Sequence, residues 1–549
     1  MLLRRPSYQE TYDAFRWEVP QDYNIAVDVC DRHATGRARR ALIYHQEETG
    51  ASTEYSFHQL RNWSDRLAAA LRSLGIERGD RIAIVLPQSP QAALTHLASA
   101  KLGAVAVPLF CLFGPDALQY RLHDSGAKAV FVNAENLEKV TAIRSRLPSL
   151  KLIVVVTQGS ASEFHRFDEL LTGARGPFAP VRTRAEDPAL LIYTSGTTGP
   201  PKGALHAHRA LLGHLPGVEF SNNFAPQPDD CFWTPADWAW VAGLMDVLLP
   251  AWHHGLPVVA GTFRKFDPER AFALLGRHRI RNALIPPTAL KMMREVPEPR
   301  NRYRFRLRSI FSGGEPLGAE VLEWAKGTLG VTVNEVYGQT EANMVVGSCH
   351  EVMGIKPGSM GRPIPGHRVE VIGEDGSPAP AGEIGEIAVR RPDPVMFLEY
   401  WKSPRATREK FTGDWARTGD LARMDNDGYI WFVGRTDDLI TSSGYRIGPA
   451  EVEESILKHP DVSMAAVIGV PHAIRGAIVK AFVKPKPQCR PTPELRRSIQ
   501  EFVKTRLGSH EYPREISFVE SFPMTTSGKI LRRELRKQEE AERRSPRET

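Results

Sequence analysis

Cysteine is scarce in this sequence, and no two cysteines lie close together. The 549 residues contain five cysteines, all far apart, and no CxxC pair. This spacing argues against a cysteine metal site and is typical of a reduced, intracellular protein. A chain of this length can bury a large core and does not need disulfides for stability.

Long apolar runs are also missing. No stretch approaches the roughly 18 apolar residues that a membrane-spanning helix needs. The N-terminal segment MLLRRPSYQETYDAF has two arginines but no apolar region after them, so it does not resemble a secretory signal. We therefore predict a cytoplasmic protein. An organelle matrix is the weaker alternative, because the first residues are not rich in arginine and serine.

Neither sign of charge dominates the sequence. The 71 basic and 64 acidic residues are interspersed and leave a net charge of +7. The sequence has no basic stripe with interleaved aromatic residues and no zinc-finger spacing, which argues against a nucleic-acid partner. The small positive excess fits anionic small molecules as ligands.

What the sequence does contain is an alternation of short apolar runs and amphipathic helices, from about residue 55 to 340. RIAIVLP (81–87) predicts a buried strand, and PQAALTHLASAKLGAVAVPL (90–109) predicts a helix, a glycine stop and another strand. Continuous Val, Ile and Leu strands between such helices indicate an α/β fold, with parallel sheets flanked by helices. Ligands in such folds bind beyond the carboxyl ends of the strands.

The amino-acid composition and the pattern of apolar residues change near residue 355. Residues 355–434 are rich in glycine, proline and short alternating strands, which predicts a small β-barrel-like subdomain. A compact α+β unit of about a hundred residues follows, which is a common domain size. We place the boundary near Gly434–Asp437 and predict domains at 1–434 and 435–549. The charged tail after residue 531 is expected to be a solvated, frayed end.

One loop points to a phosphate ligand. YTSGTTGPPKG (193–203) contains three glycines, a run of hydroxyl side chains and one lysine. PALLIY before it predicts a strand, and HRALLGHL after it predicts a helix. A loop between them can turn backbone N–H groups and hydroxyls toward a polyphosphate. It is not a Walker A loop, because Pro201 precedes Lys202 and Gly203 follows it. A plain surface loop is the alternative.

The same string resembles the signature loop of the adenylate-forming, AMP-binding superfamily, which includes acyl-CoA synthetases, peptide-synthetase adenylation domains and luciferases. Other stretches resemble the family's remaining motifs in the expected order. They are SGGEP (312–316), VYGQTE (336–341), TGD (418–420), GRTDDLITSSGYRIGPAEVE (434–453) and TTSGKILRREL (525–535). The resemblance spans nearly the whole chain and is closest to medium-chain acyl-CoA and acetyl-CoA synthetase-like enzymes.

The resemblance implies a binding site for ATP and AMP. The implied nucleotide-binding residues are Thr194, Ser195, Gly196, Thr197, Thr198, Gly199, Lys202, Gly313, Gly314, Glu315, Pro316, Tyr337, Gly338, Gln339, Asp420, Arg435 and Arg446. The first seven would hold the β- and γ-phosphates. Thr340 would touch the α-phosphate, and Glu341 would help to hold Mg²⁺, a hard ion that suits carboxylate oxygens. Asp420 can accept hydrogen bonds from both ribose hydroxyls.

The resemblance also assigns the catalytic lysine and a mobile C-terminal domain. Lys529 would stabilise the transition state at the α-phosphate and the carboxylate. Without the match to the family, a lysine so near the end of the chain would be read as solvated. In this family the small domain rotates after adenylation, which implies Asp437 as the hinge. Gly444 would let the pantetheine arm of CoA pass close to the backbone.

The acyl pocket is the least defined part of the site. TPADWAWVAG (234–243) resembles the segment that lines it, with Trp240, Val241 and Ala242 as wall residues. Gly313 and Gly338 lack side chains; Gly338 stands where acetyl-CoA synthetases carry a tryptophan, so we expect room for acids longer than acetate. Each further buried CH₂ adds ~0.8 kcal/mol. Ordinary core packing is an equally good interpretation of the tryptophans, and EAN (341–343) departs from the family.

These features predict an AMP-forming acyl-CoA synthetase, an acid–thiol ligase that uses ATP, Mg²⁺ and CoA with a short- to medium-chain carboxylate. An acetate- or propionate-specific enzyme and a carrier-protein-loading enzyme are the alternatives. A luciferase or a non-enzymatic binding protein fits the motifs less well, and His206 and His208 are not expected to hold a metal. Chain length, pathway, a homodimeric state and a lysine acetyltransferase or deacetylase acting on Lys529 stay open.

Overall fold

The computed structural model describes residues 1–47, 49–157, 163–173, 177–194, 201–261, 263, 265–436, 438, 440–442, 445–472, 476–507, 512–524 and 530–544. Contacts divide the chain into two units. The first contains Met1–Arg368 and Arg390–Asp414, and the second contains Val369–Val389 and Trp415–Thr549. Each unit is described by itself.

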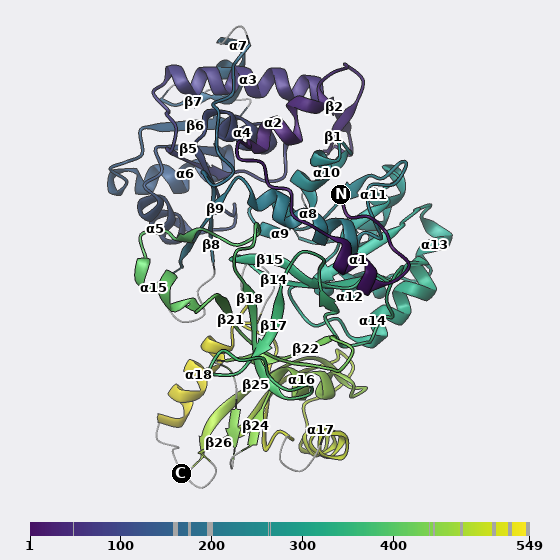
Figure 1. Cartoon of the computed structure of the whole chain (residues 1–549). Helices are drawn as coiled ribbons and strands as arrows, with labels where there is room; N and C mark the ends of the chain where they lie inside the picture. The colour runs from purple at the N-terminus through teal and green to yellow at the C-terminus, as the bar shows by residue number, and fades with distance from the viewer. Residues whose placement is uncertain are drawn as a thin grey trace. The chain divides into compact units, whose positions relative to one another are not determined.

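The first unit contains an eight-stranded sheet that carries the strand before the phosphate loop (Figure 1). In spatial order its strands are β19 (Glu399–Tyr400), β9 (Gly203–Ala207), β8 (Pro188–Tyr193), β4 (Val105–Pro108), β3 (Arg81–Val85), β5 (Ala129–Asn133), β6 (Leu152–Val156) and β7 (His165–Arg166). The strands from β8 to β7 are parallel, whereas β9 and β19 are antiparallel to their neighbours.

A nine-stranded sheet forms the other half of this unit. In spatial order its strands are β16 (Arg362–Pro363), β15 (Ala342–Gly347), β14 (Val333–Gln339), β13 (Ser309–Gly313), β12 (Asn282–Leu284), β10 (Phe232–Trp233), β11 (Val258–Ala260), β1 (Arg40–His45) and β2 (Ser52–Ser56). The strands from β14 to β1 are parallel. The carboxyl ends of β13 and β14 therefore meet at one edge, where SGGEP and VYGQTE lie.

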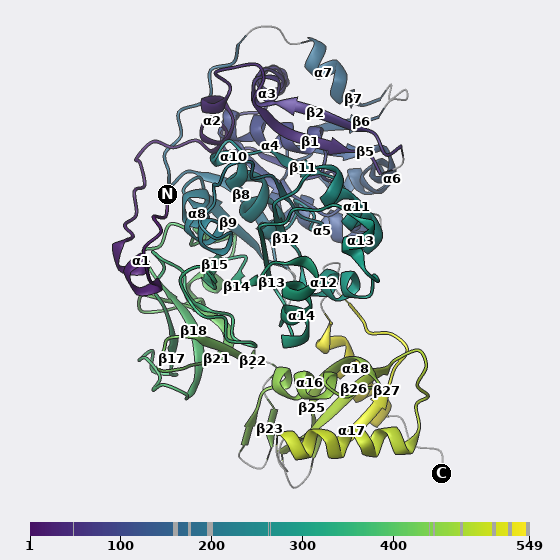
Figure 2. The same cartoon turned by 90° about the vertical axis from the view of Figure 1, so that its right-hand side faces the viewer.

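Helices cover both faces of both sheets, as predicted (Figures 1 and 2). The helices of the first unit are α1 (Tyr8–Ala14), α2 (Ile25–Val29), η1 (Asp31–His33), α3 (Phe57–Ser73), α4 (Pro90–Leu102), α5 (Pro115–Ser125), α6 (Ala134–Ile143), η2 (Arg144–Arg146), α7 (Phe167–Gly173), α8 (Ala210–Ser221), α9 (Val241–Gly243), η3 (Leu244–Leu248), α10 (Leu249–His253), α11 (Pro268–Arg277), α12 (Pro287–Arg294), α13 (Pro299–Arg302), α14 (Ala319–Trp324), η4 (Ala325–Leu329) and α15 (Pro404–Glu409). The short strand β20 (Phe411–Thr412) completes the unit.

Adjacent strand residues point into different cores. Ile84 packs in a central cluster with α3, α4 and α8, while its neighbour Val85 packs in an outer cluster with α5 and α6. In the second sheet, Phe311 faces the central cluster and Ile310 faces α11, α12 and α14. Alternate side chains of a strand point to opposite faces, so both sheets are buried on both sides and read as continuous apolar runs.

The predicted helix at PQAALTHLASAKL is α4, and its limits follow from local chemistry. The Ser89 hydroxyl accepts a hydrogen bond from the Ala92 N–H and caps the N-terminus. Such a cap contributes about 1 kcal/mol. Gly103 ends the helix with φ 66°, a left-handed conformation that glycine adopts without strain. Nearly every residue of α4 is buried, which places this helix between the two sheets.

The second unit contains an antiparallel β-structure and an α+β part. Its strands are β17 (Val369–Ile372), β18 (Ile384–Arg390), β21 (Trp415–Met424), β22 (Ile430–Arg435), β23 (Ile440–Ser442), β24 (Tyr445–Ile447), β25 (Val462–His472), β26 (Gly476–Pro485) and β27 (Glu515–Phe518), and its helices are α16 (Pro449–Leu457), α17 (Pro493–Arg506) and α18 (Arg532–Arg544). The contact division assigns β21 and β22 to this unit, so its limits differ from the predicted boundary near residue 434.

The charged tail is not a frayed end, contrary to the expectation from its composition. Residues 532–544 form α18, with Leu535 only 1% exposed. The buried Glu539 accepts a hydrogen bond from Lys480 of β26, and Arg543 pairs with Glu515 at 2.6 Å. Glu539 and Arg543 are therefore matched by partners on β26 and β27, and the buried Leu535 anchors the helix. No described helix of the chain is long and apolar enough to cross a membrane.

Candidate active site

The phosphate loop lies between two hydrogen-bonded strands. β8 is the predicted strand PALLIY, but GALHA forms the unpredicted strand β9 before helix α8 begins. The Thr194 N–H donates to the Lys202 carbonyl at 2.9 Å, so these two residues are joined across the loop. Ser195, Gly196, Thr197, Thr198 and Gly199 lie outside the described residues, and their predicted contacts with phosphate remain untested.

Side chains from three segments meet beside the loop. The Tyr193 hydroxyl donates to Asp124 Oδ2 at 2.6 Å and fixes the end of β8. The Lys202 ammonium lies 5.2 Å from the centroid of the Tyr400 ring, within the range of a cation–π contact. Because Tyr400 lies on β19, which pairs with β9, a segment two hundred residues downstream in the sequence contacts the phosphate-loop lysine.

The end of β14 brings the VYGQTE motif to the same place. The Tyr400 hydroxyl donates to Glu341 Oε1, and the Phe397 N–H donates to the Glu341 carbonyl at 2.8 Å. Lys410 Nζ donates to Gln339 Oε1 at 3.1 Å. The turn between β14 and β15 therefore carries Glu341 to the side chain that also contacts Lys202. A hydrogen bond to a charged group contributes about 1.5–3 kcal/mol.

His206, on β9, and His208, which follows β9, are both buried and neutral. Burial, with smaller contributions from His214 and Arg209, lowers the pKa of His206 to about 3. Its ring also hydrogen-bonds the Thr340 backbone, next to the predicted α-phosphate contact. His208 Nδ1 accepts from the Ile25 N–H at 3.2 Å. In the part of the chain that the structure describes, no group of three or more His, Cys, Asp or Glu side chains could hold a metal.

The SGGEP turn, whose residues Gly313 to Pro316 are predicted to bind the nucleotide, lies at the carboxyl end of β13. Gly314 has φ 89°, a conformation that a residue with a side chain rarely adopts. A Cβ on Gly313 would meet the Val336 carbonyl oxygen at 2.2 Å. Thr288 donates from its hydroxyl to Glu315 Oε2 at 2.8 Å, which fixes the turn against α12. Both glycines are therefore required by the backbone, whatever ligand the turn binds.

The predicted acyl-pocket segment follows β10. Trp240 is half-buried, with its ring 5.3 Å from that of Phe110, and Val241 is buried in α9. Ala242 packs against the central core. Trp238 is 2% exposed and belongs to that core, as the ordinary packing interpretation expected. That these residues line the acyl pocket remains a prediction.

The expectation that Gly338 leaves open depth does not fit the structure. A Cβ on Gly338 would meet the Met344 backbone nitrogen at 2.4 Å and Asn343 Oδ1 at 2.5 Å. Asn343 in turn donates to Asp246 at 2.6 Å, and Asp246 contacts His214 Nδ1 at 2.6 Å. The departure EAN thus supplies a buried polar contact. At Gly313, a Cβ would meet backbone in the same way, so neither glycine opens a cavity in the direction of its absent side chain.

In the second unit, Asp420 and Arg435 face each other across the β21–β22 hairpin. Their registers match, and Arg435 Nη1 donates to Asp420 Oδ1 at 2.9 Å. Asp420 is 6% exposed. Arg435 therefore orients the carboxylate predicted to bind ribose. The side chain of Arg446 is not described, and Asp437, Gly444 and Lys529 lie outside the described residues.

The chain on either side of the lysine motif is held together. Met524 and Ile530 form an isolated antiparallel bridge, and the Leu531 N–H donates to the Pro523 carbonyl at 2.8 Å. Helix α18 follows directly. The described residues on either side of the lysine motif are thus joined to each other, and α18 attaches the chain after the motif to the sheet of the second unit.

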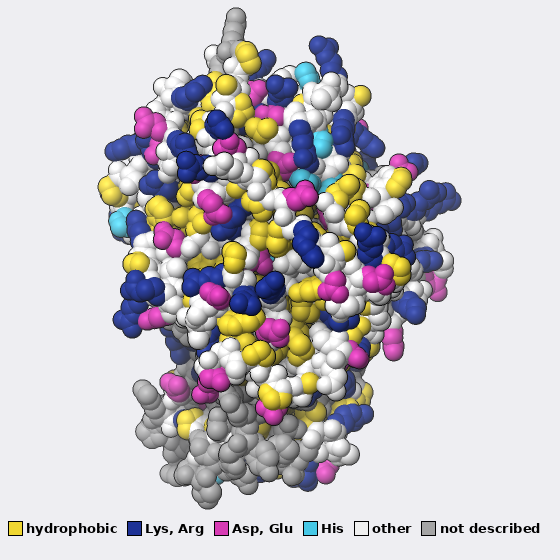
Figure 3. All heavy atoms as spheres, viewed as in Figure 1, with side chains coloured by type: hydrophobic (Ala, Val, Ile, Leu, Met, Phe, Trp, Pro, Cys, Tyr) yellow, Lys and Arg dark blue, Asp and Glu magenta, His cyan; other side chains and the backbone are white. Residues whose placement is uncertain are grey.

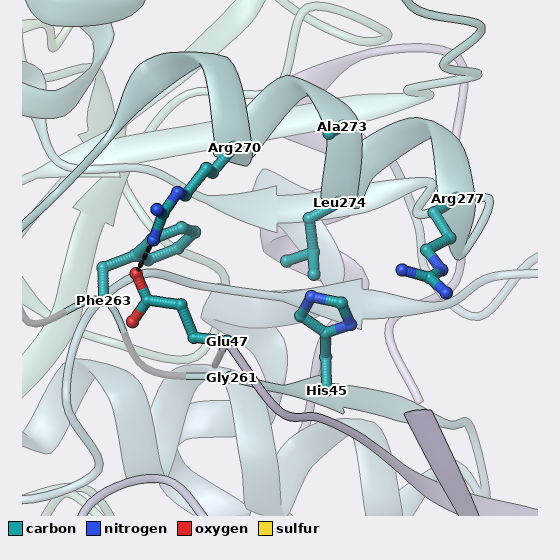
Figure 4. A pocket seen from close by; sticks show the side chains of 8 residues that line it. All are labelled: His45, Glu47, Gly261, Phe263, Arg270, Ala273, Leu274 and Arg277. Carbon is teal, nitrogen blue, oxygen red and sulfur yellow. Dashed lines mark hydrogen bonds and ion pairs between the residues drawn. The ribbon is translucent and has the colours of Figure 1, made fainter. Parts of the chain in front are cut away.

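A cavity of about 230 Å³ lies in the first unit between β1, β11 and α11 (Figure 4). Glu47 and Arg270 form an ion pair at one end, and His45 and Arg277 lie at the other. None of its lining residues belongs to the predicted site, and both arginines are solvent-exposed.

On the face seen in Figure 3, basic and acidic side chains are interspersed, consistent with the sequence pattern.

Comparison with known families decides the identity of the fold. A model of the AMP-binding enzyme family matches residues 30–401, and a model of the AMP-binding enzyme C-terminal domain matches residues 451–529. The chain belongs to the AMP-binding enzymes. This confirms the resemblance drawn from the motifs and the predicted α/β fold.

Relatives of this AMP-binding enzyme are acyl-CoA ligases and synthetases. The chain is 36% identical to an uncharacterized acyl-CoA ligase, YtcI, of Bacillus subtilis (strain 168), over 95% of this chain and 97% of that protein. It is 33% identical to an acetyl-coenzyme A synthetase of the same organism, over 96% and 94%. It is 36% identical to the mitochondrial acyl-coenzyme A synthetase ACSM4 of Homo sapiens, over 95% and 91%.

Solved structures agree with this assignment. The anthranilate CoA ligase AuaEII, crystallised with anthranoyl-AMP, matches with a TM-score of 0.87 at 28% identity, over 95% of this chain and 98% of that one. ATP-bound MatB from Rhodopseudomonas palustris matches with a TM-score of 0.83 at 27% identity, over 94% and 98%.

Two side chains near the site of this AMP-binding enzyme were not predicted from its sequence. Tyr400 lies in FLEYWK, outside every motif, and its role depends on a strand pairing that the sequence pattern does not show. Gln88 donates to the carbonyls of Thr234 and Ala236 at 3.1 and 2.6 Å and accepts from the Gly261 N–H at 3.3 Å. It ties the loop after β3 to the predicted acyl-pocket segment; its place after the strand RIAIVLP was the available signal.

Proposed function

We propose that this chain is an AMP-forming acyl-CoA synthetase, which converts a carboxylate, ATP and CoA into acyl-CoA, AMP and pyrophosphate through an acyl-adenylate. The observation that carries the proposal is the meeting of Lys202, from the phosphate loop, and Glu341, from the VYGQTE motif, at one side chain. Two motifs separated by about 140 residues in the sequence thereby form one polar site.

The first half-reaction joins two anions. The carboxylate attacks the α-phosphorus of ATP, the acyl–phosphate bond forms, and pyrophosphate leaves. The site must neutralise charge and align the reactants. Lys202 and the loop would hold the β- and γ-phosphates, Thr340 would contact the α-phosphate, and Lys529 would stabilise the charge that develops between carboxylate and phosphate. Arg435 would keep Asp420 oriented toward the ribose hydroxyls.

The residues present fit a magnesium ion bound with the nucleotide. Mg²⁺ is usually held by one or two carboxylates together with substrate phosphates, and not by an all-protein cage. Glu341 supplies such a carboxylate, and its Oε1 contacts the neutral Tyr400 hydroxyl and no described cation. When bound, Mg²⁺ would neutralise phosphate charge; the chain's own residues would orient the nucleotide.

The second half-reaction transfers the acyl group to the CoA thiol and releases AMP. We propose that residues 435–549 rotate about Asp437 between the two half-reactions, and that Gly444 then lies along the pantetheine arm. The bridge between Met524 and Ile530, on either side of the lysine segment, supports a movement of the whole domain. Acetylation of Lys529 would remove its charge and block adenylation.

The proposed acid is a short- to medium-chain monocarboxylate. Because Gly313 and Gly338 do not open space, the argument for chain length now depends on Trp240, Val241 and Ala242 and on relatives that include an acetyl-coenzyme A synthetase and an ACSM enzyme. We keep the cytoplasm as the proposed compartment.

The test is AMP release by the purified protein with acetate, propionate, butyrate, hexanoate, octanoate and benzoate, each with and without CoA. We expect CoA-dependent AMP release that is highest for an acid longer than propionate. A maximum at acetate would contradict the proposed chain length. AMP release that CoA does not stimulate for any acid would contradict the synthetase assignment and favour a carrier-loading enzyme.

A further inference from the structure

Tyr400 contacts the two oppositely charged groups of the proposed nucleotide site at once. Its hydroxyl donates to Glu341 Oε1, and its ring lies 5.2 Å from the Lys202 ammonium. The side chain is buried, with 6% exposure. Among the described contacts, no ion pair joins Lys202 to Glu341, although both contact the same side chain.

The backbone around Tyr400 fixes the ring in this position. Tyr400 is paired with Ala204 of β9, and its N–H donates to Thr407 Oγ1 at 2.9 Å. On either side, the Trp401 N–H donates to the Gly203 carbonyl at 2.7 Å and the Phe397 N–H donates to the Glu341 carbonyl at 2.8 Å. The segment is therefore hydrogen-bonded both to the strand that follows Lys202 and to Glu341 itself.

A lysine and a glutamate that can reach each other tend to pair directly. Such a pair would neutralise the lysine that is meant for phosphate and the carboxylate that is meant for a cation. A tyrosine between them prevents this, because the hydroxyl satisfies the carboxylate while the electron-rich face of the ring attracts the ammonium. Both contacts involve a neutral group and so neutralise neither charge; the acidic side chain on which Lys202 does act is Glu409, whose pKa it helps to lower.

We propose that Tyr400 is a positioning residue that holds Lys202 and Glu341 apart and aimed at the nucleotide, with its hydroxyl acting on Glu341 and its ring acting on Lys202. This inference rests on the proposed function, since it assigns Lys202 to phosphate and Glu341 to magnesium. The two parts of the side chain then have separable effects: loss of the hydroxyl weakens the magnesium-dependent part of ATP binding, and loss of the ring weakens ATP binding even without magnesium.

The test measures binding of ATP by calorimetry, in excess Mg²⁺ and in EDTA, without acid or CoA. Tyr400→Phe removes only the hydroxyl, and Tyr400→Met removes the ring as well while filling much of its volume. Tyr303→Phe is the matched control, because the Tyr303 hydroxyl also donates to a glutamate, Glu269, on the surface and outside the site. Thermal denaturation of each variant checks that the fold is kept.

We expect Tyr400→Phe to bind MgATP about tenfold more weakly, as the loss of a hydrogen bond to a charged group implies, with little change in EDTA. Tyr400→Met should bind more weakly in both conditions, and Tyr303→Phe should match the wild type. An affinity of Tyr400→Phe for MgATP equal to that of Tyr303→Phe would overturn the inference, as would an equal loss in EDTA. If Tyr400→Met does not fold, the Tyr400→Phe comparison decides.

This design separates the inference from the function on which it rests. ATP binding requires neither the right acid nor CoA, so an unknown substrate does not affect the test. A wild-type chain that binds no ATP would contradict the proposed function, whereas a wild-type chain that binds MgATP no better than Tyr400→Phe contradicts only the role of Tyr400.

Discussion

Two lysines of the first unit are held in opposite ways. Lys101 is fully buried and pairs directly with Asp31 at 2.8 Å and Asp65 at 2.6 Å. Lys202 is exposed and contacts an aromatic ring, while the nearby Glu341 bonds to a hydroxyl. The first lysine is paired with carboxylates and joins η1, α3 and α4, and the second, under the proposed function, keeps its charge for the phosphates of ATP. Direct pairing therefore distinguishes a structural lysine from one available for chemistry.

The largest expected effect concerns a third lysine, Lys529, which we propose as the catalytic residue. Lys529→Ala should lower adenylate formation by about a thousandfold, because it removes a charge that acts mainly in the transition state. Thioester formation from synthetic acyl-adenylate should be nearly unchanged. Pyrophosphate exchange measures the first step and acyl-CoA formation measures the second. An equal loss in both steps would show that Lys529 does not serve adenylation alone.

Lys101 should matter for stability and not for turnover. Lys101→Met leaves the buried Asp65 and the half-buried Asp31 without their cation, and breaking such a buried arrangement costs about 3–5 kcal/mol. Urea unfolding measures this loss, while the KM for ATP of the folded variant should stay the same. In the control, Asp31→Asn and Asp65→Asn are added to Lys101→Met, and most of the stability should return. If Lys101→Met is as stable as the wild type, the structural role assigned to Lys101 is contradicted.

Lys202 should show the reverse pattern. Lys202→Met should reduce kcat/KM for ATP by about a hundredfold, as expected for the loss of a charge on transferring phosphates, and leave urea unfolding within about 0.5 kcal/mol of the wild type, as for most surface substitutions. Steady-state kinetics and unfolding curves on the same preparation check both. A large loss of stability in Lys202→Met would show that Lys202 has a structural role like that of Lys101.

The smallest effect concerns a buried group that has no charged partner. Burial lowers the pKa of His96, on α4, to about 4. As the pH falls below about 6.5, His96 therefore becomes protonated in the unfolded chain while it stays neutral in the folded chain. Stability from this residue is present above that pH and is lost toward pH 4. His96→Gln should reduce the slope of unfolding free energy against pH in this window. An unchanged slope would contradict a neutral buried imidazole.

Local patterns predicted much of the fold. PQAALTHLASAKL became α4, because its serine cap, proline start and glycine stop all act within the helix itself. The apolar runs became strands buried on both faces. The charged tail was mispredicted because Leu535 packs against residues of β25 and β26 and Glu539 bonds to Lys480 of β26, and composition does not reveal these partners.

The site divides in the same way. The motifs placed Lys202 and Glu341 on elements whose ends converge, and the family was confirmed by comparison. Tyr400 could not be predicted, because its two contacts arise from the pairing of β19 with β9. The depth at Gly338 was misjudged, because an absent side chain does not report which atoms occupy its direction, and here these are atoms of Asn343 and Met344.

The bridge between Met524 and Ile530 has a consequence for the pace of the reaction. Because the residues on either side of the lysine segment are bridged and a docked helix follows, we propose that Lys529 enters and leaves the site together with the surrounding domain. Under the proposed mechanism, each acyl-CoA that is made requires this domain to rotate away once and to return once through the solvent. Solvent viscosity should slow multiple turnovers more than it slows a single adenylation in a chain that already has the lysine in place.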